Sequence, residues 1–238
     1  MPSDPVQALL SVLLVDAAIL GIAIGLFWAG VFVARRLGHP VDYGLGSLGL
    51  SKPRSGYLAA TRLGFAVGVG ALMVSFVILP LSILVVEELG YSTERTVQEP
   101  LMRGIQWWVG ESPEVAIPST VFVVVLFAPA VEEIIFRGAI FGGLRKLVAL
   151  PFRRLHKHAK VRGTVSFTFA ALVSSVLFAL LHLEPVLVPT LFLLGIALCA
   201  LYRRTGSLLP CFAAHATFNS FAVLVIILSG LEALPVQV

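Results

Sequence analysis

The sequence contains little charge and almost no cysteine. Only 13% of its 238 residues are Asp, Glu, Lys or Arg, whereas 58% are hydrophobic. A typical soluble domain carries about 25% charged residues. The two cysteines, Cys199 and Cys211, lie in apolar runs, where they form no disulfide framework and no CxxC metal site. We expect them to pack as small hydrophobic residues. These shortages exclude a soluble domain and predict an all-α, polytopic bundle of transmembrane helices.

Six long apolar runs divide the chain. A helix that crosses a bilayer needs about 20 predominantly apolar residues. Such runs lie near residues 6–34, 59–86, 115–143, 165–183, 186–202 and 208–230. No internal repeat or linker separates them, so we expect a single integral domain. In the second run, Gly64, Gly68 and Gly70 are expected to let a neighbouring helix approach closely.

The loops between these runs differ in charge. Segment 35–57 carries four basic residues and one acid, segment 144–163 carries seven basic residues and no acid, and Arg203-Arg204 closes the fifth run. Segment 87–114 instead holds six glutamates and two arginines. Because basic loops stay in the cytoplasm, both termini are expected outside a bacterial cytoplasmic membrane. The bases lie between apolar runs, so the expected partners are membrane lipids and not nucleic acid.

Three charged residues interrupt the third apolar run, namely Glu132, Glu133 and Arg137. A charge at the centre of a bilayer costs about 2.5–3.5 kcal/mol, so such residues indicate function. Glu133 precedes Arg137 by four residues, which is the favoured order for an ion pair on one helix. Adjacent helical side chains point about 100° apart, so the two glutamates are not expected to face the same partner. Glu132 is then unpaired on its own helix and is a candidate general base.

Few other polar groups lie deep in the apolar runs, and four of them are candidates to meet Glu132. His182 ends the fourth run, and Asp16 lies in the first. His215 and Asn219 are four residues apart in the last run, so they share one helix face. For Asp16 two interpretations stay open, a contact with the site or a contact with hydroxyl groups of a neighbouring helix.

The depth of each candidate follows from the helical rise of about 1.5 Å per residue. Counted from the nearest cytoplasmic basic residue, Glu132 lies ~20 Å deep, His215 ~16 Å and Asn219 ~22 Å, so these three can meet near mid-membrane. His182 lies ~30 Å from the basic end of its run, which is too far out. It reaches the others only if residues 163–166 form a loop, so that the helix starts lower, or if the helix tilts.

Two kinds of chemistry suit these residues. Glu132, helped by His182, can take a proton from water and direct the water at a carbonyl carbon, while His215 and Asn219 donate hydrogen bonds to the developing oxyanion. Alternatively, Glu132, His182 and His215 can hold a divalent metal such as Zn²⁺, because one carboxylate and two histidines form a known catalytic zinc set. The helical metalloprotease signature HExxH is absent. Both possibilities stay open.

The order and spacing of these motifs resemble the CPBP family, which includes type II CAAX prenyl endopeptidases and bacteriocin-immunity (Abi) membrane proteins. The family pattern of EExxxR, FxxxH and HxxxN is matched by Glu132-Glu133-Ile134-Ile135-Phe136-Arg137, by Phe178 to His182 and by His215 to Asn219. Pro129 before the glutamates, Gly138 after the arginine and Thr205-Gly206-Ser207 before the last run match as well. The resemblance covers roughly residues 117–222.

The resemblance implies an intramembrane endopeptidase that acts on a peptide or lipid-modified protein. It implies a catalytic helical core over 115–230. The apolar runs and the loop charges predict two transmembrane helices and an acidic extracytoplasmic loop over 1–114, and this part matches nothing specific in the family. It also implies roles for six residues: water activation for Glu132 and His182, oxyanion stabilisation for His215 and Asn219, and support for Glu133 and Arg137. Both a metal-dependent and a metal-free mechanism are proposed for the family.

Two other function classes use similar residues. A proton-coupled transporter can carry Glu, His and Arg inside the membrane, but it usually shows an internal repeat or paired broken helices, and the sequence has neither. A non-catalytic membrane immunity or scaffold protein is the other alternative, and the complete set of motifs argues against it.

Overall fold

The computed structural model describes residues 4–36, 38, 45–90, 98–149 and 159–233, and all regular structure within these residues is helical. Six helices are long and apolar enough to cross a membrane, which confirms the predicted count. Five of them are α1 (Pro5–Arg36), α2 (Tyr57–Glu88), α7 (Ala159–Leu180), α8 (Val188–Thr205) and α9 (Leu209–Gly230). The sixth is a continuous helical run over Pro113–Ala149.

That sixth helix is irregular around the charged motif. In chain order it consists of α4 (Pro113–Thr120), η2 (Val121–Phe127), α5 (Ala128–Glu133), η3 (Ile134–Phe141) and α6 (Gly142–Ala149). Both η2 and η3 are π-helical. Pro129 has no N–H to donate to the preceding turn, and it lies where η2 ends. Single π-helical turns inside α-helices occur frequently at functional sites, and Glu132 and Glu133 lie between the two.

A short amphipathic helix, α3 (Glu99–Glu111), lies in the segment that was expected to be an acidic loop. Gly104, Ile105 and Val109 are buried on one side of it, and Arg103 forms an exposed ion pair with Glu99 on another. Residues 99–111 are therefore not a loop. Their apolar positions are spaced for a helix face.

The fourth span differs from its prediction at both ends. α7 begins at Ala159 and ends at Leu180, so residues 163–166 are helical and the suggested loop there is wrong. His182 lies beyond the end of the helix, in a turn. Leu183 has a φ of 56°, and Pro185 follows, which cannot continue a helix. The helix therefore ends before His182.

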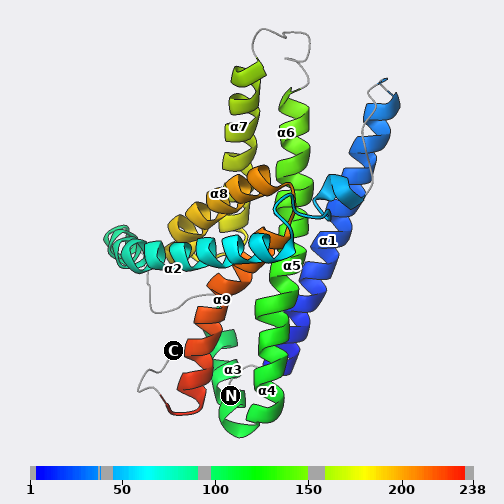
Figure 1. Cartoon of the computed structure of the whole chain (residues 1–238). Helices are drawn as coiled ribbons and strands as arrows, with labels where there is room; N and C mark the ends of the chain where they lie inside the picture. The colour runs from blue at the N-terminus through cyan, green and yellow to red at the C-terminus, as the bar shows by residue number, and fades with distance from the viewer. Residues whose placement is uncertain (1–3, 37, 39–44, 91–97, 150–158, 234–238) are drawn as a thin grey trace.

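The helices pack into one bundle, in which α1 lies beside the long run from α4 to α6, and α7 lies beside α6 (Figure 1). α2 packs along α9 and also touches α8. The main hydrophobic core contains Val131 of α5, Phe178 of α7, Leu194 and Leu198 of α8 and Ala214 of α9, all nearly inaccessible. The charged motif therefore sits where α5, α7, α8 and α9 meet.

Two of the three glycines of α2 allow a close approach of α9. A Cβ atom at Gly64 would collide with the carbonyl oxygen of Pro210, and one at Gly68 would lie 2.5 Å from that of Ala214. A Cβ at Gly70 would meet nothing within 4 Å. The prediction of close packing is thus confirmed for Gly64 and Gly68 and wrong for Gly70, which faces away from α9. The spacing of four residues is the one that places small residues on a single helix face.

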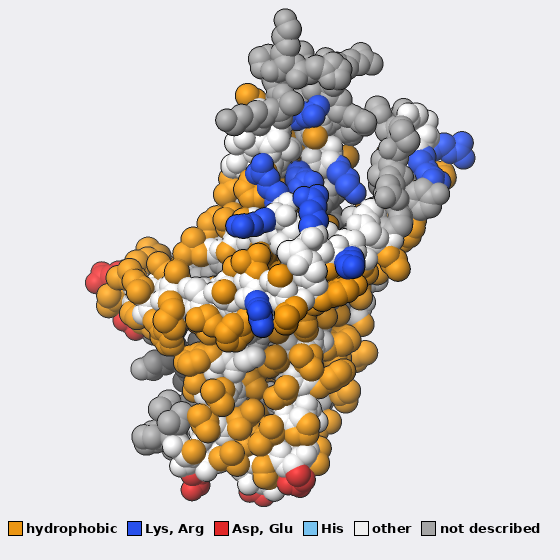
Figure 2. Space-filling view, in the orientation of Figure 1, with side chains coloured by type: hydrophobic (Ala, Val, Ile, Leu, Met, Phe, Trp, Pro, Cys, Tyr) orange, Lys and Arg blue, Asp and Glu red, His pale blue; other side chains and the backbone are white. Residues whose placement is uncertain are grey.

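Charges of opposite sign lie at different ends of the molecule. Lys and Arg side chains gather in the upper half of the view in Figure 2, whereas Asp and Glu lie at its lower edge and at its far left. A wide hydrophobic band lies between the basic side chains and the acids at the lower edge, whereas the acids at the far left lie at the height of this band. This separation is what a spanning protein requires. The assignment of the basic end to the cytoplasm stays a prediction.

Candidate active site

A buried ion pair lies at the centre of the bundle. Oε1 of Glu133 is 2.9 Å from Nη1 of Arg137, one helical turn later, and neither side chain is more than 1% exposed. The guanidinium group also lies over the ring of Phe178 on α7, with Cζ 4.3 Å from the ring centroid. Such cation–π contacts are strongest where water is excluded. The acid and the ring together compensate the buried charge of Arg137.

His215 of α9 lies between the two glutamates. Its Nδ1 is 2.9 Å from Oε1 of Glu133, and its Nε2 is 3.7 Å from Oε2 of Glu132. Because an ionised carboxylate only accepts hydrogen bonds, Nδ1 carries the hydrogen that is donated to Glu133. The expectation that the two glutamates cannot share a partner is therefore wrong. The two ring nitrogens point in different directions, so one imidazole reaches both carboxylates.

Glu132 is the more accessible of the two acids. Its side chain is 17% exposed, against 1% for Glu133. Its Oε2 atom is itself buried and has no hydrogen-bond partner among the described residues. Both contacts of Glu133, to Arg137 and to His215, use Oε1, and its Oε2 atom is unpartnered in the same way. The two acids therefore differ in the exposure of their side chains.

His182 contacts the same phenylalanine as the buried charges. Its Nδ1 donates to the backbone carbonyl of Phe178 at 2.8 Å, which leaves Nε2 available. Its ring lies 4.9 Å from the ring of Phe178, and that ring lies 5.4 Å from His215. His182 lies past the end of the spanning helix, and burial lowers its pKa to about 4, so the ring is neutral at pH 7. The Phe178 ring thus lies between the turn that holds His182 and the buried residues His215 and Arg137.

Asn219 makes a contact that its motif does not predict. Its Nδ2 donates to the carbonyl oxygen of Val124 in η2, at 3.1 Å. The side chain therefore ties α9 to the π-helical segment that precedes the two glutamates. An asparagine amide has two N–H donors, so one can still serve another acceptor. Only the irregularity of η2 could have indicated this contact, and the sequence analysis did not foresee it.

Asp16 belongs to an apolar stripe of α1 that faces the bundle. Leu13 before it and Leu20 after it pack against buried core clusters, and the spacing puts Asp16 on the same face. Its Oδ2 atom is buried and has no hydrogen-bond partner among the described residues. Of the two interpretations, a place near the site is the one this position favours.

The residues considered for a metal do not form a ligand cluster. Among the described residues, no group of three or more His, Cys, Asp and Glu side chains is arranged to hold an ion. Glu132 and His215 approach each other, but His182 does not complete a set of three with them. The described geometry therefore does not fit the Zn²⁺ set of Glu132, His182 and His215, and no step is assigned to a metal.

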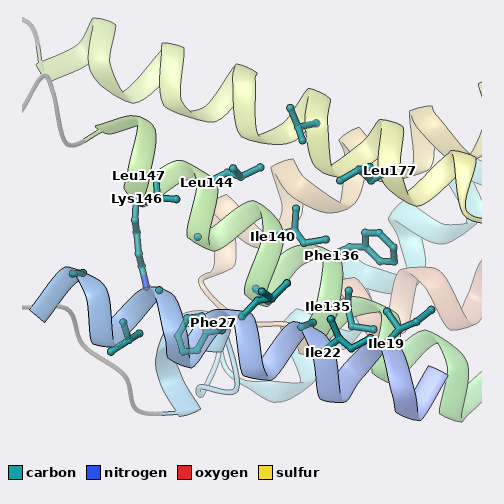
Figure 3. Close-up of a pocket in the computed structure, with 18 of the residues that line it drawn as sticks. Ile19, Ile22, Phe27, Ile135, Phe136, Ile140, Leu144, Lys146, Leu147 and Leu177 are labelled. Atoms are coloured by element: carbon teal, nitrogen blue, oxygen red, sulfur yellow. The ribbon is translucent and has the colours of Figure 1, made fainter. Parts of the chain in front are cut away.

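An apolar groove leads from the bundle centre toward the basic end. It has a volume of about 900 Å³ and is lined by α1, by η3 and α6, and by α7. Ile135 and Phe136, which lie between Glu133 and Arg137 in the sequence, form part of its wall (Figure 3). Lys146 extends from α6 toward α1 in the same view, and Arg162 also lines the groove. The groove combines an apolar wall with basic side chains.

Other contacts around the centre were also not predicted from the sequence. The ring of Phe178 contacts Arg137, His182 and His215, although the FxxxH motif indicates only its relation to His182. Gln98 and Glu184, which lie far apart in the sequence, are hydrogen-bonded beside His182. A glutamate two residues after the histidine and directly before Pro185 was the available signal for this last contact.

Comparison with known proteins gives partial matches. Residues 114–221 match the family model described as Rce1-like, type II CAAX prenyl endopeptidase. The chain is 30% identical over 109 residues to the "Putative membrane peptidase YdiL" of Bacillus subtilis (strain 168), covering 46% of this chain and 38% of that protein. It is 32% identical over 108 residues to the "Membrane-embedded CAAX protease MroQ" of Staphylococcus aureus (strain USA300), covering 45% and 39%.

The matched stretch thus spans less than half of the length of either relative. No solved structure gives a significant match. The segment matched by the family model holds all three motifs. Residues 114–221 are thus similar to the Rce1-like CAAX prenyl endopeptidases, which supports the resemblance to the CPBP family.

Proposed function

We propose that this protein is an intramembrane endopeptidase that hydrolyses peptide bonds of membrane-associated substrates, either CAAX-type proteins or peptide precursors. One observation carries the proposal: the partly accessible carboxylate of Glu132 lies beside His215, which Glu133 and Arg137 hold in place. The name of the relative MroQ agrees with this class. The core over 115–230 supplies the chemistry, and 1–114 supplies two helices and the acidic connection.

Glu132 and His182 activate the water in this proposal. The carboxylate of Glu132 takes a proton from a water molecule, and the water oxygen attacks the carbonyl carbon of the scissile bond. The free Nε2 of His182 can accept the second hydrogen of that water, because Nδ1 is bonded to the Phe178 carbonyl. The proton on Glu132 then passes to the leaving nitrogen as the carbon–nitrogen bond breaks. Glu132 is thereby restored as a carboxylate.

His215 and Asn219 stabilise the oxyanion. His215 donates to Glu133 through Nδ1, so it can donate to the oxyanion through Nε2 only as an imidazolium. Asn219 donates one N–H to Val124 and has a second for the oxyanion. Donors fixed before the reaction are effective because they need no reorganisation. Glu133 and Arg137 act as support, since they fix the His215 ring.

The apolar groove is consistent with a substrate that lies in the membrane. It reaches the wall formed by Ile135 and Phe136 from the side of α1 and α7. Ile22, Leu26 and Leu177 line it and are well exposed, so it is open to lipid in a bilayer. A lipid-modified or hydrophobic substrate can bind in it without leaving the membrane, beside Ile135 and Phe136 on the helix that carries Glu132. We place the protein in a bacterial cytoplasmic membrane with both termini outside.

The test compares the N-terminal peptides of cells that contain the wild type or the Glu132→Ala protein. New N-termini near membrane segments should disappear in the variant. Purified protein in liposomes should then cleave the identified substrate, with Glu132→Ala and His182→Ala each reducing kcat by about 10²–10⁴-fold. Glu114→Ala is a matched control, because Glu114 lies on the same helical run but is exposed.

Full proteolysis by the Glu132→Ala protein would refute the proposal. If Glu132→Gln restores a deletion phenotype completely, an immunity or scaffold role replaces it. Flux of a solute through liposomes that depends on Glu132 and occurs without cleavage would instead establish a transporter.

A further inference from the structure

The turn that carries His182 has a strained backbone. α7 ends at Leu180, and Leu183 adopts a φ of 56°, in the left-handed region that non-glycine residues rarely occupy. Such conformations persist only where surrounding contacts enforce them, and they cluster at active sites. Because the end of a helix frays easily, His182 needs contacts from elsewhere to stay in place.

Glu184 provides one such contact. Its side chain belongs to a residue that is only 3% exposed, and its Oε1 accepts a hydrogen bond from the backbone N–H of Gln98 at 2.7 Å. Gln98 is the N-cap residue of α3. The first N–H groups of a helix have no partner within the helix, and a carboxylate there is favoured by the helix dipole. Glu184 thus joins the His182 turn to the start of α3.

A second contact reaches His182 directly. Nε2 of Gln98 donates to the backbone carbonyl of His182, at 3.4 Å. α3 is itself held firmly against α9, where a Cβ atom at Gly230 would lie 2.6 Å from the carbonyl oxygen of Gln106. α9 also carries His215. Through α3, the position of His182 is therefore fixed relative to that of His215.

We propose that Glu184 and Gln98 are positioning residues that hold His182 at the catalytic centre. The inference rests on the proposed function and extends it to Gln98, which lies outside the region matched by the family. Glu184 holds the turn through the length of its side chain, because its oxygen has to reach the backbone N–H of Gln98. A carboxylate is not required for this, because an amide oxygen accepts the same hydrogen bond.

Two conservative variants show whether the length or the charge of the Glu184 side chain matters. Glu184→Gln keeps the length of the side chain and loses its charge, whereas Glu184→Asp keeps the charge and is one methylene shorter. We expect Glu184→Gln to retain kcat within about threefold and Glu184→Asp to lose about tenfold or more, with KM nearly unchanged, because misplacement by about 1 Å can cost 10²-fold. Glu111→Ala, an exposed acid at the other end of α3, is the control.

A double-mutant cycle shows whether the effect passes through His182. In the His182→Ala background, Glu184→Asp should cause no further loss of kcat, because coupled residues are not additive. The proposal is overturned if Glu184→Asp is at least as active as Glu184→Gln, or if the two losses add. Loss of activity in His182→Ala together with an unaffected Glu184 series refutes only this inference. Full activity of His182→Ala refutes the role assigned to His182 as well.

Discussion

The two histidines of the centre are held in opposite ways. His215 is 1% exposed and lies in the middle of a helix, with a carboxylate near each ring nitrogen. His182 is half-buried, lies past the end of its helix, and is fixed by backbone hydrogen bonds and by the contact of Glu184 with Gln98. Both rings contact Phe178. One side of the site is therefore built from buried charge, and the other from a strained turn.

Because the two histidines are held differently, their replacement should affect folding and activity differently. Removing one partner of a buried charge pair leaves the other charge without compensation, which is strongly destabilising. Removing a side chain from a turn at the end of a helix leaves no buried charge unpaired. Variants on the His215 side should therefore affect folding and activity together. Replacement of His182 itself should affect activity alone.

The largest effect is expected for Arg137→Ala. It leaves Glu133 buried without its cation, so the free energy of unfolding in detergent micelles should fall by about 3–5 kcal/mol. Arg103→Ala is a matched control, because Glu99 and Arg103 form the same i,i+4 pair at the same 2.9 Å, but with Arg103 64% exposed. Its loss should be below about 1 kcal/mol. Equal losses at the two sites would show that burial does not set the strength of the pair.

The two histidines themselves give the next effect. His215→Ala should lower both kcat and the free energy of unfolding, the latter by about 1–3 kcal/mol, since Glu133 loses a buried hydrogen bond. His182→Ala should lower kcat by about 100-fold or more and leave unfolding unchanged. Unfolding followed by tryptophan fluorescence and cleavage of the same substrate supply both measurements. A stability loss in His182→Ala as large as in His215→Ala would remove the contrast.

The sequence predicts those features that depend on short stretches of chain. The six spans follow from the length of apolar runs, and the pair of Glu133 and Arg137 follows from a spacing of four residues on one helix. Such contacts need no knowledge of neighbouring helices. They were predicted correctly for that reason.

Features that depend on packing between helices were not predictable in the same way. The sharing of His215 by two glutamates depends on how α9 faces α5, and the contact of Asn219 with Val124 depends on an irregular helix. Likewise, the place of His182 depends on Gln98, which is 84 residues away in the sequence. Spacing along one helix gives no information about such contacts.

A smaller effect is expected from the packing of α2 against α9. Gly68→Ala places a Cβ 2.5 Å from the carbonyl oxygen of Ala214, directly before His215. The two helices must move apart, which should cost about 1–3 kcal/mol and lower kcat by displacing the imidazole. Gly70→Ala on the same helix meets nothing within 4 Å, so stability should be equal or slightly higher, because alanine favours a helix over glycine. Identical unfolding of the two variants would contradict the close approach.

The smallest effect on stability is expected for Leu183→Gly, in the turn. Glycine adopts the φ of 56° without strain but loses more conformational freedom on folding, so the two effects nearly cancel and unfolding should change by less than about 1 kcal/mol. Gly206→Ala tests the same conformation in reverse, because Gly206 ends α8 with a φ of 70°, and it should destabilise by about 1–2 kcal/mol. Since glycine also loosens the turn, Leu183→Gly should lower kcat severalfold without affecting KM. If kcat stays at the wild-type value, the hydrogen bonds of Gln98 and Glu184 hold His182 without help from the Leu183 side chain, and the strain at this position is not needed for catalysis.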